Sequence, residues 1–180
     1  MREIYETLAH TPWWVYVLLV VLVRRGLAAR QPGVHSFSRL LIMPLLFTLW
    51  GIWEMITVLH PGTALVLVWF IAVLVGAGVG QALLRGISVR ADHAHWLIGR
   101  PGDMSLLPIA LISFAVKYAF AYALGVNPSL AHSTVYAAGD IIASGLISGV
   151  FIGKLAVYWI KFRAAPSEML TEAPRGGHSP

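Results

Sequence analysis

Five long apolar segments, separated by polar connections, constrain this chain more than any other feature of its sequence. A helix needs about 20 mainly apolar residues to cross the hydrocarbon core of a bilayer, and in lipid it satisfies its backbone hydrogen bonds internally. Only 12% of the residues are charged, whereas soluble domains average about a quarter. We therefore predict an all-α membrane protein, a five-transmembrane-helix bundle over about residues 12–29, 40–59, 63–84, 106–124 and 134–160.

The first apolar run is interpreted as a retained helix rather than a cleaved signal peptide. Arg24 and Arg25 follow the run directly, whereas a signal peptide carries its positive charge before the apolar region. The first helix is therefore predicted to run from the outside of the membrane to the cytoplasmic side, with its arginines at the cytoplasmic end.

Lysines and arginines occur in every other connection, so they fall on one side of the predicted membrane. The second connection (60–62) and the fourth (126–133) contain none, and only Arg2 joins them on that side. Because positive residues are retained in the cytoplasm, we predict an outer N-terminus and a cytoplasmic C-terminus. The inner connections and the C-terminal end hold the basic residues Arg24, Arg25, Arg30, Arg39, Arg85, Arg90, Arg100, Lys154, Lys161, Arg163 and Arg175.

The third connection, residues 86–103, has the period of a strand. Apolar and polar residues alternate from Ile87 to Asp92, as in a half-buried strand. This pattern predicts a small cytoplasmic β-hairpin that turns near 92–95 and leans on the first connection or on the membrane surface, because an isolated hairpin is marginal in water. Residues 1–163 are then a single membrane domain, and the Pro-, Gly- and Ser-rich residues 164–180 are predicted to be a disordered cytoplasmic tail.

Small residues recur every four positions in the third and fifth segments. Such ridges let helix backbones approach closely, and in lipid that packing drives helix association. We interpret them as contacts within the bundle; a homodimer face is the alternative. The two ridges are Ala72, Gly76 and Gly80, and Gly145, Gly149 and Gly153.

Three ionisable residues, Glu54, Lys117 and Asp140, interrupt the second, fourth and fifth segments. Ionisable groups inside a membrane are costly and need a partner. At 1.5 Å per residue all three lie roughly 9–12 Å below the outer helix ends, so they share one layer. A Lys117–Asp140 pair with Glu54 as a further partner follows, either as a structural tie or as a proton, ion or ligand site. Tyrosines and a tryptophan at similar depth can add hydrogen bonds, namely Tyr118, Tyr122, Tyr136 and Trp50.

Histidines offer a weaker metal or haem hypothesis. His10, His60 and His132 fall at the outer interface, although they come from separate segments without ligand spacing and suit polar interface residues equally well. His93 and His95 share one side of the predicted hairpin, where a polar turn is favoured over a metal site. The chain has no cysteine, which excludes thiolate chemistry, and it contains no phosphate-binding loop or zinc-protease motif. We predict no cofactor.

Several short motifs together resemble a family of small, uncharacterised proteobacterial inner-membrane proteins. They are His10-Thr11-Pro12, the arginine-rich first connection, Val89-Arg90-Ala91-Asp92 through Leu97-Ile98-Gly99-Arg100-Pro101-Gly102, and Phe114-Ala115-Val116-Lys117-Tyr118. More distantly, the helices flanking a cytoplasmic hairpin look like the membrane proteins related to the cytochrome-c-biogenesis protein CcdC. The resemblance implies a bacterial inner membrane and no established activity or site residues.

The leading functional hypothesis is non-enzymatic: a membrane scaffold, assembly factor or accessory subunit, with a homo-oligomer or another membrane protein as partner. A proton- or ion-coupled transporter using Lys117, Asp140 and Glu54 is the first alternative, and a haem-binding or redox protein is the second. Nucleic-acid binding is disfavoured, because topology already explains the net charge of +5. The first-connection arginines also suit anionic lipid headgroups; these are Arg24, Arg25, Arg30 and Arg39.

Overall fold

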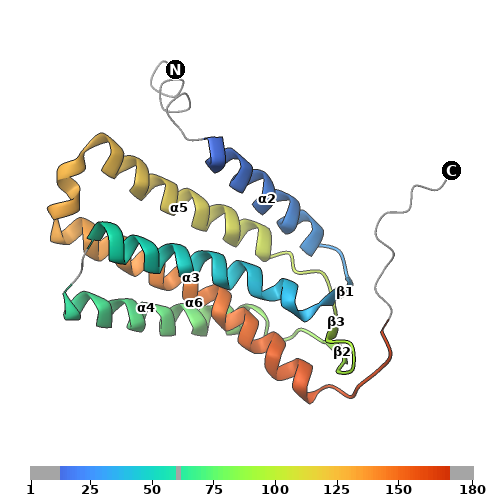
Figure 1. Cartoon of the computed structure of the whole chain (residues 1–180). Coiled ribbons are helices and arrows are strands. Elements are labelled where there is room, and N and C mark those ends of the chain that lie inside the picture. The colour runs from blue at the N-terminus through green and yellow to red at the C-terminus, as the bar shows by residue number, and fades with distance from the viewer. Residues whose placement is uncertain (1–12, 60–61, 171–180) are drawn as a thin grey trace.

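The structure, a computed structural model, describes residues 13–59 and 62–170. In these residues five α-helices lie side by side in a bundle, and a small sheet closes one of its ends (Figure 1). A 3-10 turn at Phe37–Leu41 leads into the second of these helices, and a π-helical turn at Met55–Leu59 extends it. The five helices are α2 (Trp13–Ala29), α3 (Ile42–Glu54), α4 (Thr63–Leu83), α5 (Leu106–Val126) and α6 (Thr134–Ala164).

Four helical stretches in the described residues are long and apolar enough to cross a membrane. They are 37–57, 63–83, 106–126 and 134–164. The five-helix count agrees with the sequence, but α2 has only 17 residues. At 1.5 Å per residue it reaches about 26 Å, short of a hydrocarbon core of about 30 Å. Crossing by α2 therefore stays a prediction.

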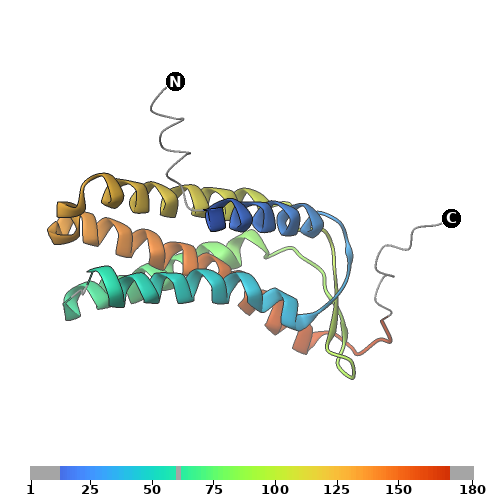
Figure 2. The ribbon, with the colours of Figure 1, turned by 45° about the horizontal axis from the view of Figure 1, so that its top comes forward.

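Helix α6 is the central element of the bundle. It contacts α3, α4 and α5, whereas α2 packs on α5 (Figures 1 and 2). Its placement matches its sequence, because α6 is the longest helix described, carries one of the two small-residue ridges, and buries more of its surface than the other spans. An apolar cluster of Leu22, Met43, Phe47, Ala110 and Phe151 joins α2, α3, α5 and α6 in the middle of the bundle.

The two small-residue ridges face each other across α4 and α6. A Cβ added to Gly149 would fall on the carbonyl oxygen of Val73, and one added to Gly76 would fall on that of Leu146. A Cβ on Gly145 would meet the Cβ of Ala72 at 2.7 Å. The backbones of α4 and α6 therefore touch along this seam, as close-packed membrane helices do.

The sheet contains three antiparallel strands in the order β1-β3-β2. The predicted hairpin is present as β2 (Arg90–Asp92) and β3 (Leu97–Arg100), with Ala91 opposite Ile98. Its other edge pairs with β1 (Gly33–Ser36), a strand from the first connection that the sequence pattern did not reveal. The hairpin thus gains the third strand that an isolated pair needs for stability in water.

Residues 165–170 pack against the sheet, which differs from the disordered tail predicted to begin at residue 164. Ser167 forms a parallel bridge with Ala91, and Glu168 N donates a hydrogen bond of 2.8 Å to the Ala91 carbonyl. Leu170 is buried, and its N–H donates to Asp92 Oδ2 at 3.2 Å. This segment therefore covers the open edge of β2, as native sheets require of exposed edges.

Candidate functional site

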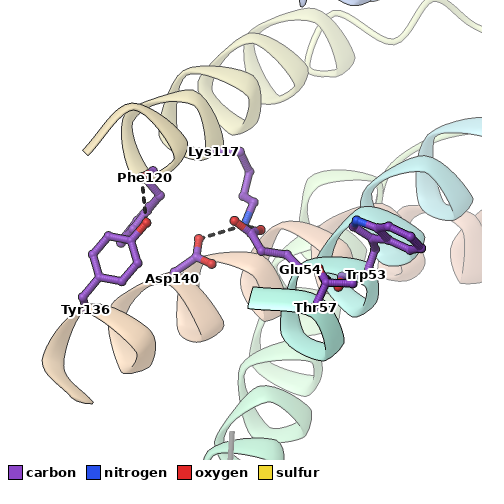
Figure 3. Close-up of polar contacts among 7 residues, drawn as sticks. All are labelled: Trp53, Glu54, Thr57, Lys117, Phe120, Tyr136 and Asp140. Carbon is purple, nitrogen blue, oxygen red and sulfur yellow. Dashed lines mark hydrogen bonds and ion pairs between the residues drawn. The ribbon is translucent and has the colours of Figure 1, made fainter. Parts of the chain in front are cut away.

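A buried ionic triad of Glu54, Lys117 and Asp140 joins α3, α5 and α6 (Figure 3). Lys117 on α5 donates to Asp140 Oδ1 on α6 at 2.7 Å, and it also donates to Glu54 Oε2 on α3. The structure thus brings together the three ionisable residues that the sequence placed in one layer. Helices α5 and α6 are joined only by the short turn Pro128–His132, so residues at equal depth on these two helices become neighbours.

The triad is almost completely shielded from solvent. Lys117 is 2% exposed and Asp140 is 1% exposed, while the Glu54 side chain retains 13% exposure. Burying a charge is costly unless it is paired, and here one ammonium faces two carboxylates. If all three groups are ionised, the triad carries one uncompensated negative charge, which a single proton or monovalent cation would neutralise.

The backbone changes its winding directly after Glu54. Residues Met55–Leu59 form a π-helical turn, and the Thr57 hydroxyl donates to the Trp53 carbonyl at 2.7 Å (Figure 3). Single π-turns occur mostly inside α-helices and are frequent at functional sites. Glu54 is therefore the last α-helical residue before this turn.

Of the predicted supporting tyrosines, Tyr136 bridges two helices of the triad, whereas Tyr118 and Tyr122 stack along α5. The Tyr136 hydroxyl donates to the Phe120 carbonyl at 2.7 Å (Figure 3). That bond ties α6 to α5 and directs the phenolic proton to the backbone. Tyr118 stacks between Phe114 and Tyr122, with ring centroids 6.2 and 6.4 Å away.

The structure does not assemble a metal site from the histidines that it describes. His10 and His60 lie outside the described residues, and His132 is exposed in the turn between α5 and α6. His93 Nε2 bonds the Phe162 carbonyl at 2.8 Å, while His95 Nδ1 bonds Asp92 Oδ2 at 3.0 Å. Within the described ranges, no group of three or more His, Asp or Glu residues is arranged to hold a metal ion.

A second buried ion pair lies near the sheet end of the bundle. Lys154 on α6 contacts Asp103 Oδ2 at 2.7 Å and donates to Ser105 Oγ at 2.7 Å. Ser105 in turn donates to Asp103 Oδ1 from both its hydroxyl and its backbone N–H. Lys154 and Asp103 are 3% and 4% exposed. This pair fastens the entry of α5 to the inner half of α6.

Sequence reasoning missed this second pair. Asp103 belongs to a turn signal, and Lys154 was counted among the basic residues of the inner end. The available signal was depth, because Lys154 lies ten residues before the last residue of α6, Ala164. A lysine about 15 Å inside a helix end needs a partner.

Arg100 and Tyr158 extend the second pair toward the sheet. Tyr158 donates to Asp103 Oδ2 at 3.5 Å, and Arg100 lies over the Tyr158 ring at 5.7 Å from its centroid. Burial by itself would raise the pKa of Asp103, but the Lys154 ammonium and the hydrogen bonds from Ser105 hold it below its ordinary value. Asp103 is therefore ionised at neutral pH.

The family model for a family of unknown function, DUF6622, matches residues 1–165, which include both ion pairs and the sheet. No curated protein and no solved structure matches the chain. The match covers more than nine-tenths of the 180 residues. This chain belongs to the family of unknown function DUF6622.

Proposed function

We propose that this protein is a non-enzymatic scaffold, assembly or accessory protein of the bacterial inner membrane. The observation that carries the proposal is the use of the buried charges, which tie helices to one another. Lys117 connects α5 to α3 and α6, and Lys154 connects α6 to the entry of α5. Such ties fix helix register, the best-attested role of buried ionic groups.

The helix bundle carries the sheet and the segment that covers the edge of β2, and together these form a platform at one end of the bundle. We define the platform as β1, β2, β3 and residues 165–170. The basic first and third connections and the C-terminal end of α6 gather there (Figure 1). Under the positive-inside rule this end faces the cytoplasm and the N-terminus lies outside. The resemblance to proteobacterial inner-membrane proteins, and more distantly to CcdC-related ones, favours the same location.

An aromatic cluster beside the platform suits a membrane interface. Trp96 and Trp159 stack with ring centroids 6.2 Å apart, and Arg163 lies over Trp159 at 5.4 Å. Trp96 is half exposed and takes a φ of 54°, a conformation that is uncommon for a bulky residue. Aromatic side chains of this kind anchor membrane proteins at headgroup level, which would hold the platform at the bilayer surface.

Site-specific photocrosslinking in cells tests the scaffold role. A photoreactive amino acid replaces Ser88 or Trp96 on the platform side, and Leu74, 72% exposed in the middle of α4, serves as the lipid-facing control. A scaffold gives one reproducible protein adduct from the platform positions and none from position 74. The proposal fails if neither platform position gives an adduct or if all three positions give the same ones.

Proton- or ion-coupled transport is the second candidate, because the triad has two carboxylates for one ammonium and adjoins a π-helical turn. Proteoliposomes containing a trapped pH dye separate the two candidates. A scaffold gives no proton flux above that of protein-free liposomes. A transporter gives flux that Asp140→Asn abolishes, whereas Glu168→Gln, which changes an exposed carboxylate outside the triad, preserves it.

A further inference from the structure

A cavity of about 530 Å³ opens near the platform end of the bundle, between α2, α3, α5 and α6. Its volume lies within the range of small-ligand sites, about 300–1,000 Å³. The cavity lies on the platform side of the apolar cluster that joins α2 to α3, and two residues of that cluster, Met43 and Phe151, form part of its wall. The cavity is therefore bounded by helices that the apolar cluster already holds together.

Positive charge dominates the cavity wall. Five cationic side chains and one carboxylate line it, an excess of four positive charges. The carboxylate, Asp103, is already paired with Lys154 at 2.7 Å, so the surplus is made of guanidinium groups. The cationic residues are Arg24, Arg25, Arg39, Arg100 and Lys154.

Two observations show that this charge is not fully used within the protein. Arg24 and Arg25 form no ion pair with any residue in the described ranges. Arg100 donates from Nη1 to the Tyr158 hydroxyl, but its Nε is buried without a hydrogen-bond partner among the described residues. A buried donor left unsatisfied is costly, so an acceptor that enters the cavity can relieve this cost.

Guanidinium groups select the chemistry of the ligand. Their planar, forked donors match the paired oxygens of a phosphate. Arg24 and Arg25 lie within about 8 Å of the inner end of α2, the depth of the headgroup region. Apolar side chains such as Val21, Met43 and Leu106 line the rest of the cavity, which suits the glycerol backbone and the first acyl methylenes of a lipid.

We propose that this cavity binds the phosphate headgroup of an anionic phospholipid. The inference rests on the cytoplasmic placement of the platform under the proposed function, because anionic headgroups there meet basic pockets between helices. The structure also changes which basic residues we assign to lipid binding. Arg24, Arg25 and Arg39 line the cavity and Arg30 does not, whereas Arg100 and Lys154 join the set.

Lipid titration of the full-length protein in detergent tests the proposal. Phosphatidylglycerol is added, and bound lipid is counted by native mass spectrometry, with neutral phosphatidylcholine and inorganic phosphate as comparison ligands. Wild-type protein is expected to bind phosphatidylglycerol in preference to phosphatidylcholine. Each cavity arginine changed to glutamine, as in Arg24→Gln or Arg39→Gln, should weaken binding about fivefold. Arg85→Gln is the matched control, because Arg85 is an exposed arginine at the same end outside the cavity wall.

Each outcome decides the proposal. Equal loss in Arg24→Gln and Arg85→Gln would mean diffuse surface attraction and would overturn it. Competition by millimolar inorganic phosphate that empties the site completely would identify a soluble phosphate ligand and overturn the lipid assignment. Arg24 is exposed, so its variant should fold even if Arg100→Gln does not. Orientation does not affect binding in detergent, so failure of the predicted topology and failure of this site are distinguishable.

Discussion

Lys117 Nζ lies 2.7 Å from Asp140 Oδ1, and the two residues are 23 positions apart on adjacent antiparallel helices. Both side chains are almost fully buried. The same ammonium also contacts Glu54 on a third helix, so one positive charge is shared by two carboxylates. Removing Lys117 therefore leaves two carboxylates without a cation, whereas removing either carboxylate leaves one balanced ion pair.

Lys117→Met should be the most damaging single change in the triad. It leaves two carboxylates facing each other without a cation, and breaking a buried pair in this way costs about 3–5 kcal/mol. Asp140→Asn leaves one lysine with one glutamate, a balanced pair, and should cost only about 1 kcal/mol. Chemical unfolding of the purified protein in detergent measures both changes.

The triple change Lys117→Met, Glu54→Gln and Asp140→Asn provides the control for the Lys117 prediction. It removes every charge, so its stability should exceed that of Lys117→Met alone. If the triple variant is less stable than Lys117→Met, the charges are not opposed in the way the geometry indicates. If Asp140→Asn is as damaging as Lys117→Met, charge balance does not govern the site.

The depth of the triad could be predicted from the sequence, but the pairing of Lys154 with Asp103 could not. Glu54, Lys117 and Asp140 sit at similar distances from clear helix ends, and a fixed rise per residue converts those distances into one layer. Asp103 lies outside a helix, in a connection whose path depends on tertiary contacts. Its pairing with Lys154 therefore needs the packed bundle, although the depth of Lys154 in α6 already indicated that this lysine needs a partner.

The hairpin could likewise be predicted because its pairing is local, whereas the contacts of β1 and of residues 165–170 with it are long-range. Strands β2 and β3 follow each other in sequence, and alternating apolar residues mark the first of them. Gly33–Ser36 is only four residues long and has no alternating pattern, so its pairing with β3 is a tertiary event. Leu170 is buried beside Asp92 at a sequence separation of 78, in a segment whose composition is typical of disorder.

Gly76→Ala and Gly78→Ala should have opposite effects, although the two residues are two positions apart on α4. A Cβ at Gly76 would fall on the Leu146 carbonyl of α6, whereas a Cβ at Gly78 meets nothing within 4 Å. Overpacking of this kind costs about 1–3 kcal/mol. Removing an unneeded glycine gains about 0.4–1 kcal/mol. Unfolding free energies of the two variants in detergent check this, and equal effects would contradict the backbone contact between α4 and α6.

Asp92 should make the platform sensitive to acid. Hydrogen bonds from His95 and from Leu170 N hold its pKa at about 2, below the ordinary value of 3.8. A carboxyl with a lowered folded-state pKa stabilises the fold above its unfolded pKa, and that contribution disappears as the pH falls through the folded pKa. Wild type should therefore be more stable than Asp92→Asn at pH 6, and the difference should shrink between about pH 4 and pH 2.

Thermal unfolding of both proteins across this pH range measures the Asp92 effect. Glu168→Gln is the matched control, because Glu168 also lies beside β2 but its side chain is 48% exposed. Its difference from wild type should change less with pH than that of Asp92→Asn. A constant difference between wild type and Asp92→Asn from pH 6 to pH 2 would remove Asp92 as the acid-sensitive group.

Single cysteines in this cysteine-free chain can decide whether α2 crosses the membrane. Ser129 and Ser88 are exposed residues at opposite ends of the bundle. In spheroplasts a membrane-impermeant maleimide should label Ser129→Cys directly and Ser88→Cys only after permeabilisation, because basic connections stay in the cytoplasm. Ala9→Cys, before the first apolar segment, should label like Ser129→Cys if all five helices span. Labelling like Ser88→Cys would instead leave four spans, with the 17-residue α2 held at the bundle without crossing.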